Sequence, residues 1–81
     1  MYKYMDDTTI KERFGAFLKA ERIKRKMTQV ELAELVGISN QRLSNYEKGQ
    51  KMPGYANFIR INEALGRDPG RTLMKIAHPT K

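Results

Sequence analysis

The sequence predicts an all-α fold, a compact bundle of about five short helices. No segment alternates apolar and polar residues in the way that a half-buried strand would. Helix-capping residues and glycines instead divide the chain into helical stretches. The chain has 81 residues, and a domain of that size buries only about 60% of the surface that its unfolded chain exposes. We therefore expect one domain with one modest core.

The first helix is expected to run from Thr9 to about Arg25, after an N-terminal arm of residues 1–8. Thr9 and Glu12 have the spacing of a capping box, in which each side chain bonds a free backbone N–H of the first turn. An apolar stripe at helical spacing supports this helix. The stripe consists of Phe14, Phe17 and Leu18.

The second helix is expected to follow Thr28, which has the spacing of a capping box with Glu31. Gly37 ends this helix, because glycine easily adopts the left-handed conformation with which a chain leaves a helix. The side chains expected to face the core are Val30, Leu32, Ala33, Leu35 and Val36.

Ser39 is expected to cap the third helix, which runs to about Lys48 and stops at Gly49. The turn before this helix is short and contains Gly37. Two short helices joined by a turn of three or four residues with glycine are the signature of a helix-turn-helix. The sequence predicts this motif at residues 28–48.

The fourth helix is expected at residues 55–65. Pro69 then begins a fifth helix that reaches about Ile76, because proline is favoured at the first helical position. The predicted domain therefore covers residues 9–76, and residues 77–81 form a C-terminal tail.

The charge of the chain favours an anionic partner. The formal net charge is +7, from 16 lysines and arginines against 9 aspartates and glutamates. Basic chains attract polyanions, and phosphate contacts supply much of the affinity for nucleic acids. The alternative is that the charge only keeps the protein soluble. A membrane surface is not expected, because no long basic helix has a bulky apolar face free to insert.

The composition also argues against several classes of protein. The chain contains no cysteine, so it has no disulfide or thiolate metal site, which fits a cytoplasmic location. His78 is the single histidine, and no metal or other cofactor is expected. We find no signal-peptide segment, no apolar run of the roughly 18 residues that span a membrane, and no small-molecule site. No catalytic grouping indicates an enzyme.

The third helix carries different side chains on its two sides. With about 100° between successive residues, Leu43, Tyr46 and Glu47 lie together on what must be the core side. The opposite side of this helix carries amide and basic side chains, which are the types that bond base edges in the major groove of DNA. The alternative is an ordinary solvated face, but the second helix of a helix-turn-helix is the one that enters the groove. These outer residues are Gln41 and Asn45, flanked by Arg42, Ser44 and Lys48.

A series of spaced residues between positions 14 and 73 matches one family pattern. The matching residues are Arg22, Thr28, Gln29, Glu31, Leu32, Ala33, Gly37, Ile38, Ser39, Leu43, Ser44, Glu47, Gly49, Pro53, Phe58, Ile61, Ala64, Leu65 and Gly66. With them the chain resembles the Cro/repressor-type helix-turn-helix domains, the XRE family. This family includes lambdoid phage repressors, restriction-modification controller proteins and some antitoxins.

The resemblance implies a lambda repressor-like DNA-binding domain and roles for particular positions. Arg22 and Glu47 would form an interior salt bridge. Lys24, Arg25 and Lys26 would be either phosphate contacts or a solvated basic patch. The residues that would meet base edges are Asn40, Gln41, Arg42, Ser44 and Asn45. Those that would meet the DNA backbone are Gln29, Lys48, Gln50 and Lys51.

The function that the resemblance implies is a sequence-specific transcriptional regulator of double-stranded DNA, a repressor. The alternative is an antitoxin-type interaction protein that neutralises a partner toxin and binds its own operator. Such antitoxins usually carry an additional segment that wraps the partner, and this chain has only its short arm and tail for that purpose.

Three positions depart from the family pattern. Lys26 stands where relatives often have glycine, and a left-handed lysine would cost about 1 kcal/mol. Gly54 replaces the usual serine or threonine cap of the fourth helix, and glycine is a tolerable cap. Asn62 replaces a small apolar residue, so we expect it at the edge of the core or at an interface.

The fifth helix is apolar on more than one side, so its apolar residues cannot all face one small core. A domain of this size reads about half of a typical operator, and dimers of this class bind two half-sites about one helical turn apart. We therefore expect a homodimer that forms through the fifth helix, with Leu73, Met74 and Ile76 at its surface. The alternative is an ordinary C-terminal helix that folds onto its own domain.

Overall fold

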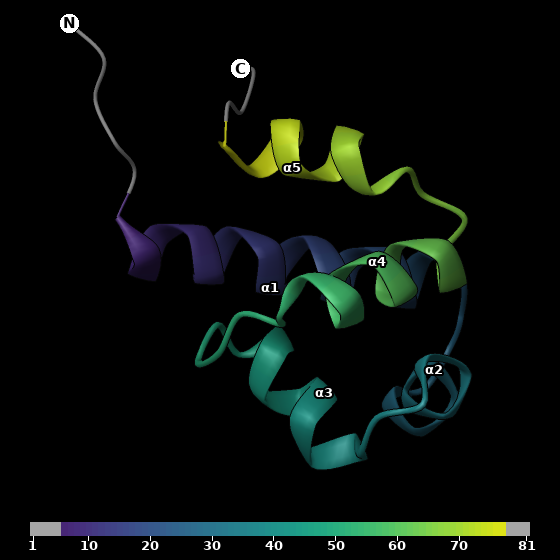
Figure 1. Cartoon of the computed structure of the whole chain (residues 1–81). Helices are drawn as coiled ribbons and strands as arrows, with labels where there is room; N and C mark the ends of the chain where they lie inside the picture. Colours follow the sequence, from purple (N-terminus) through teal and green to yellow (C-terminus); the bar gives the residue numbers. More distant parts are fainter. Residues whose placement is uncertain (1–5, 78–81) are drawn as a thin grey trace, which may run out of the picture.

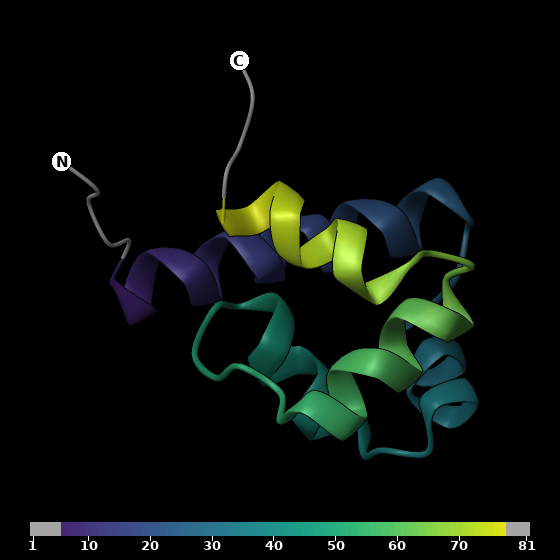
Figure 2. The ribbon, with the colours of Figure 1, turned by 45° about the horizontal axis from the view of Figure 1, so that its top comes forward.

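The computed structural model describes residues 6–77, and within them every regular element is a helix (Figure 1). The predicted all-α fold is confirmed. Helix α1 is the longest, and α5 packs on one side of it while α3 packs on another (Figure 1, Figure 2). The five helices are α1 (Asp7–Lys24), α2 (Gln29–Val36), α3 (Asn40–Glu47), α4 (Tyr55–Ala64) and α5 (Pro69–Ala77).

The start of α1 differs from the prediction. The helix begins at Asp7, and Asp6 is its cap, because the Asp6 carboxylate accepts a hydrogen bond from the backbone N–H of Thr9 at 2.8 Å. That bond also lowers the pKa of Asp6. Thr9 is thus inside the first turn, and the predicted boundary at residue 9 was wrong. At the other end, Ala77 belongs to α5 and not to a tail, and the rest of the expected arm and tail, His78 included, lies outside the described residues.

The helix-turn-helix has the local structure that its sequence predicts. The Thr28 hydroxyl accepts from the N–H of Glu31 at 3.0 Å, and the Glu31 carboxylate accepts from the N–H of Thr28 at 2.8 Å. Gly37 ends α2 in the left-handed conformation, with φ at 85°. Ser39 then caps α3 by accepting from the N–H of Arg42 at 3.0 Å. One end of the turn is therefore determined by the backbone of Gly37 and the other by the side chain of Ser39.

Side chains from all five helices form one core, in which the rings of Phe14 and Phe58 lie 5.2 Å apart. Two residues expected in this core are exposed: Val30 at 51% and Leu35 at 65%. Helix α2 packs on α3 and α4, which cover one arc of its surface, and Val30 and Leu35 fall on either side of that arc. The core consists of Phe14, Leu18, Leu32, Ala33, Val36, Leu43, Tyr46, Phe58, Ile61, Leu65 and Ile76.

Gly15 allows α1 and α3 to approach closely. A Cβ atom at this position would lie 2.6 Å from the carbonyl oxygen of Tyr46 and 2.7 Å from that of Glu47. Real Cβ atoms do not come so near to backbone oxygens, so any larger residue would push the end of α3 away from α1. The position of α3 relative to the longest helix therefore depends on this glycine, which the sequence patterns did not single out.

Asn62 lies in the interior, between α4 and α5. The expectation that it lies at the edge of the core or at an interface was wrong. Its side chain is fully buried. The amide nitrogen donates to the carbonyl oxygen of Phe58 at 2.8 Å, and the amide oxygen accepts from the hydroxyl of Thr72. Both polar ends are satisfied, so burial of this amide is tolerated and the pair links α4 to α5.

A second polar link joins α1 to the segment between α4 and α5. The Glu21 carboxylate is buried and accepts two hydrogen bonds from Arg67, at 2.9 and 3.0 Å, and one from Arg25 at 2.6 Å. The pKa of Glu21 is lowered to about 2, mainly by the hydrogen bonds from Arg67. Arg25 also donates to the carbonyl oxygen of Leu65. None of the described helices is both long enough and apolar enough for a membrane crossing.

Candidate nucleic-acid interface

The outer face of α3 comprises the five residues Asn40, Gln41, Arg42, Ser44 and Asn45. The first three are exposed and the last two are half-buried. Leu43 and Tyr46 lie on the opposite side with at most 3% exposure, so their burial determines which side of α3 is presented to solvent. The amide nitrogen of Gln41 donates to the amide oxygen of Asn45 at 3.3 Å, which places these two amides side by side.

The outer face contains no acidic side chain, because the acidic residue of α3 is turned inward. The Glu47 carboxylate is 3% exposed and accepts from Nε of Arg22 at 2.6 Å and from its Nη2 at 3.0 Å. The bond to Glu47 raises the pKa of Arg22. The third nitrogen of Arg22, Nη1, donates to the carbonyl oxygen of Met27 at 2.8 Å. Arg22 is therefore a structural residue that joins α1, the loop after it and α3.

Glu47 also binds Gln29, the first residue of α2. The amide nitrogen of Gln29 donates to Oε1 of Glu47 at 3.0 Å. An ionised carboxylate only accepts hydrogen bonds, so the amide must present its nitrogen to it. One proton of that nitrogen is used in this bond, and within residues 6–77 the second has no protein acceptor. The start of α2 is thereby held beside the end of α3.

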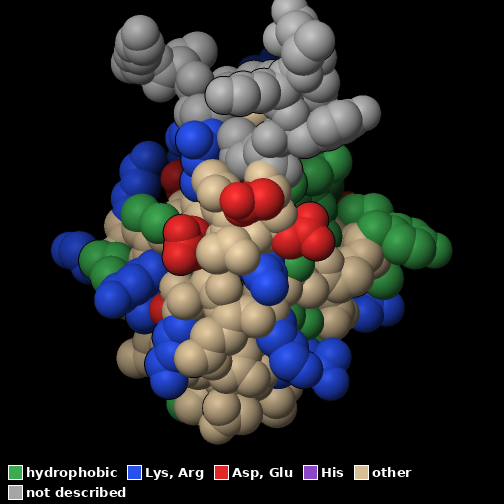
Figure 3. All heavy atoms as spheres, turned by 90° about the vertical axis from the view of Figure 1, so that its left-hand side faces the viewer, with side chains coloured by type: hydrophobic (Ala, Val, Ile, Leu, Met, Phe, Trp, Pro, Cys, Tyr) green, Lys and Arg blue, Asp and Glu red, His purple; other side chains and the backbone are tan. Residues whose placement is uncertain are grey.

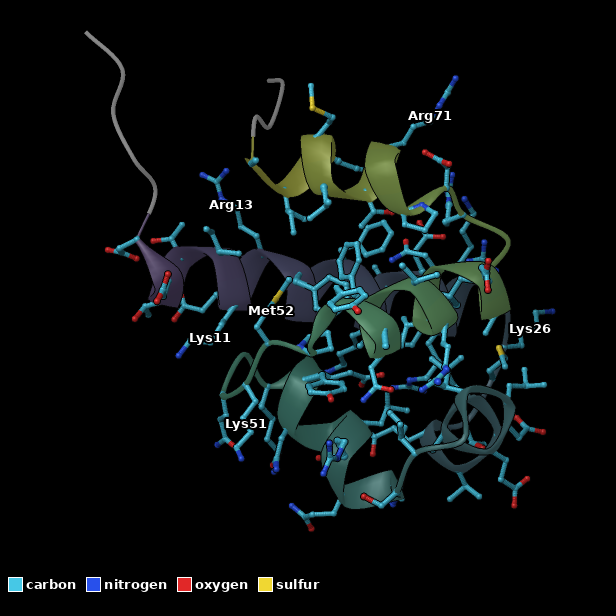
Figure 4. The ribbon with its side chains drawn as sticks, viewed as in Figure 1. Lys11, Arg13, Lys26, Lys51, Met52 and Arg71 are labelled. Carbon is cyan, nitrogen blue, oxygen red and sulfur yellow. The ribbon has the colours of Figure 1, made fainter. Side chains whose placement is uncertain are left out.

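The other residues expected at a DNA backbone lie directly after α3. Lys48, Gln50 and Lys51 are all exposed. Figure 4 shows Lys51 in the loop on the same side of the molecule as α3. Figure 3 shows uncharged polar surface over α3 and this loop, with Lys and Arg side chains on both flanks and acidic side chains farther up, toward the start of α1. The structure thus places Lys48, Gln50 and Lys51 directly after α3, and the Gln29 side chain beside the end of that helix.

A groove of about 400 Å³ separates α3 from the start of α4. Half of its lining belongs to the outer face of α3 or to residues that the sequence placed at the DNA backbone. Tyr46, Met52 and Gly54 were not expected here, because their positions depend on how α4 packs against α3. The lining residues are Ser39, Gln41, Arg42, Asn45, Tyr46, Lys51, Met52 and Gly54.

The basic residues at the end of α1 are separate from this surface. Arg25 is bound to Glu21 and to the carbonyl oxygen of Leu65, which gives it a structural role, and a phosphate contact of this residue stays a prediction. Lys26 adopts the expected left-handed conformation, with φ at 58°, and lies across the molecule from Lys51 (Figure 4). Among the described residues, no group of three or more acidic or histidine side chains is placed to hold a metal ion.

Helix α5 presents two of the three apolar residues that we expected at a dimer surface. Leu73 is 49% exposed and Met74 is 62% exposed. Ile76 is only 4% exposed and packs in the core, so its place at such a surface was wrong. The reason is helical geometry, since Thr72 and Ile76 are one turn apart on the buried side of α5, which packs on α1 and α4.

Comparison with known proteins identifies relatives of this arrangement. Residues 18–71 match the family described as helix-turn-helix. The repressor protein C2 of Salmonella phage P22 is 32% identical over 59 residues, which are 73% of this chain and 27% of the repressor. This chain thus matches little more than a quarter of that relative's length.

Solved structures resemble the fold over most of its length. The clp gene regulator ClgR of Corynebacterium glutamicum superposes with a TM-score of 0.76 at 30% identity, over 83% of this chain and 71% of that one. The restriction-modification controller protein C.AhdI of Aeromonas hydrophila gives 0.71 at 27% identity, over 74% and 91%. The P22 c2 repressor, crystallised with a synthetic operator, gives 0.71 at 27% identity, over 83% and 96%.

The helix-turn-helix, the interior pair of Arg22 and Glu47, and the outer face of α3 all lie within the matched residues. The resemblance that the sequence indicated is therefore confirmed. This chain belongs to the helix-turn-helix family of the repressor type, the XRE family.

Proposed function

We propose that this chain is the DNA-binding module of a sequence-specific transcriptional regulator, a repressor, that reads the major groove with α3. The observation that carries the proposal is the outer face of α3, where amides and a guanidinium are exposed while the single acidic residue of the helix is bound inside. Side chains of these types bond base edges in pairs, Gln and Asn with adenine and Arg with guanine.

In this proposal the two sets of residues have different tasks. The outer face of α3 selects the sequence through Asn40, Gln41, Arg42, Ser44 and Asn45. Gln29, Lys48, Gln50 and Lys51 bind the phosphate backbone and determine how α3 lies in the groove. The second amide proton of Gln29, together with the N–H groups at the start of α2, is suited to a phosphate oxygen.

The relatives support a regulator more than the antitoxin alternative. They are named as a phage repressor, a gene regulator and a restriction-modification controller, and one was crystallised with an operator. We found no feature of the described residues that favours a toxin partner. A regulator of this kind acts in the cytoplasm of a bacterial cell, which is the location that we propose.

We further propose that two copies bind one operator through α5. Leu73 and Met74 supply exposed apolar surface for this contact. Leu73→Glu should leave the fold intact and yield a monomer in sedimentation, because the side chain is half exposed. Leu35→Glu, at an exposed leucine of α2, is the matched control and should remain dimeric. A wild-type chain that sediments as a monomer at all concentrations would contradict this part of the proposal.

The central test is a selection of bound duplexes from a random DNA pool. We expect a shared motif of two half-sites. Gln41→Ala should then lose about 1–3 kcal/mol of discrimination at particular base pairs. Lys48→Ala should weaken binding to all sequences alike and reduce the slope of log affinity against log salt by about 1. A selection that returns no shared motif would refute the sequence-specific function.

A further inference from the structure

The groove between α3 and the start of α4 has the chemistry of an anion site. Two of its lining side chains, Arg42 and Lys51, are exposed cations, and none is acidic. Gln41 and Asn45 belong both to the outer face of α3 and to the wall of this groove. A duplex that lies against the outer face of α3 therefore brings a strand of its backbone to the mouth of the groove.

Tyr46 supplies a donor to this groove that the sequence patterns did not indicate. The residue is 3% exposed and its ring belongs to the core, yet it also lines the groove. Its hydroxyl oxygen accepts from the amide nitrogen of Asn57 at 3.4 Å, and the amide oxygen of Asn57 accepts from Arg60 at 3.1 Å. A phenolic hydroxyl can accept and donate at the same time. Within residues 6–77 no acceptor is recorded for its proton, which is thus available to a ligand.

The start of α4 adds backbone donors beside this hydroxyl. Its cap is Gly54, which lines the groove and makes no side-chain hydrogen bond to the first turn. The free N–H groups of a helix start carry partial positive charge and bind anions well. Tyr46, Lys51 and Gly54, the cap of α4, therefore line one groove.

We propose that the Tyr46 hydroxyl donates a hydrogen bond to a DNA phosphate that lies in this groove. Asn57, itself bound by Arg60, holds the hydroxyl oxygen so that its proton faces the groove. Lys51 supplies the charge and Tyr46 the direction of the contact. This inference rests on the proposed DNA-binding function. It adds a contact to the DNA phosphate backbone that is made by a residue from the core side of α3.

Tyr46→Phe tests the inference, because it removes one hydroxyl and keeps the ring that the core requires. The matched control is Tyr55→Phe, on α4 but 84% exposed and outside the groove lining. Both variants are titrated, as full chains, with a mixed-sequence duplex and with a duplex recovered from the selection, after thermal unfolding has verified that each is folded. We expect Tyr46→Phe to bind both duplexes about tenfold more weakly, as for a lost bond to a charged group.

Two further measurements separate this contact from others. The salt slope should be unchanged by Tyr46→Phe, because a neutral donor displaces no counterion, and reduced by Lys51→Ala. The double variant Tyr46→Phe/Asn57→Ala should lose less binding free energy than the sum of the losses of the two single variants, because Asn57 acts through the hydroxyl.

Equal affinities of Tyr46→Phe, Tyr55→Phe and the wild type would overturn the inference. So would a loss confined to the selected duplex, because that would place the hydroxyl at a base. The titration with the mixed-sequence duplex needs no shared motif, so it can fail or succeed independently of the selection.

Discussion

Glu21 and Arg22 are neighbours on α1, and each begins a charged network that leads to a different part of the molecule. Arg22 reaches the Glu47 carboxylate at the end of α3, and its side chain is 12% exposed. Glu21 reaches Arg67 before α5, and that arginine is 40% exposed. The first network positions the proposed DNA surface, while the second holds the far side of the bundle. Because the first network is less exposed, we expect it to contribute more to the free energy of unfolding. We expect the contribution of the second network to depend more on the pH of the solvent.

Glu47→Ala should have the largest effect, because it leaves Arg22 as a nearly buried charge without its partner. Breaking such a pair costs about 3–5 kcal/mol of unfolding free energy. The loss should be measured by urea unfolding, and DNA binding should weaken with it because Gln29 also loses its acceptor. Glu34→Ala, at an exposed acidic residue of α2, is the control and should change stability by less than about 0.5 kcal/mol. Equal effects of the two variants would contradict the structural role of the pair.

Gly15→Ala tests the contact between α1 and α3 without touching any charge. The added methyl group would meet two backbone oxygens that cannot move independently, so we expect a loss of about 2–3 kcal/mol. Gly70→Ala is the control, because its Cβ would lie 3.2 Å from Oδ2 of Asp68, a side-chain atom that accepts from the N–H of Arg71, and would meet no backbone atom. The gain of about 1 kcal/mol that alanine brings in a helix is offset by the shift of this oxygen, so we expect a change within about 1 kcal/mol of zero. Thermal unfolding of the two variants distinguishes a clash from the general effect of glycine replacement.

Glu21→Gln tests how the stabilisation by the second network depends on pH. The folded pKa of Glu21 is lowered from 4.5 to about 2, so its stabilisation is present above pH 4.5 and is lost as the pH falls from 4.5 toward 2. Because Arg67 is partly exposed, we discount the contribution for solvent screening to about 1–2 kcal/mol.

The unfolding free energies of the wild type and of Glu21→Gln should therefore differ at pH 7 and converge near pH 2. Glu63→Gln, at an exposed acidic residue of α4, controls for the loss of one negative charge. A gap between wild type and Glu21→Gln that stays constant down to pH 2 would show that ionisation of Glu21 is not what stabilises this side.

Lys26→Gly should have the smallest effect and concerns the loop between α1 and α2. Glycine removes the left-handed strain of about 1 kcal/mol but makes the unfolded chain more flexible, so we expect a gain below about 1 kcal/mol. The same variant decides between the two interpretations of this basic residue. An unchanged salt slope of DNA binding indicates a solvated patch, whereas a slope reduced by about 1 indicates a phosphate contact.

The features that could be read from the sequence are those decided within a few residues. The capping box of Thr28 with Glu31, the Ser39 cap and the left-handed Gly37 each depend on atoms no more than four residues away. The same holds for the outer face of α3, because helical periodicity alone separates Gln41 and Asn45 from Leu43 and Tyr46. The pair of Arg22 and Glu47 is more distant in sequence and was found through family resemblance, not through any local rule.

Only the tertiary structure decided the remainder, because it depends on which element covers which side of a helix. Val30 and Leu35 are apolar at helical positions, but none of the described helices buries them. Burial of Asn62 is tolerated because Thr72, ten residues away, satisfies its amide oxygen. Glu21 meets Arg67 across 46 residues. The sequence by itself thus determined the helices and the chemistry of the outer face of α3. Packing determined which polar side chains support that face, since burial is a property of neighbours in space.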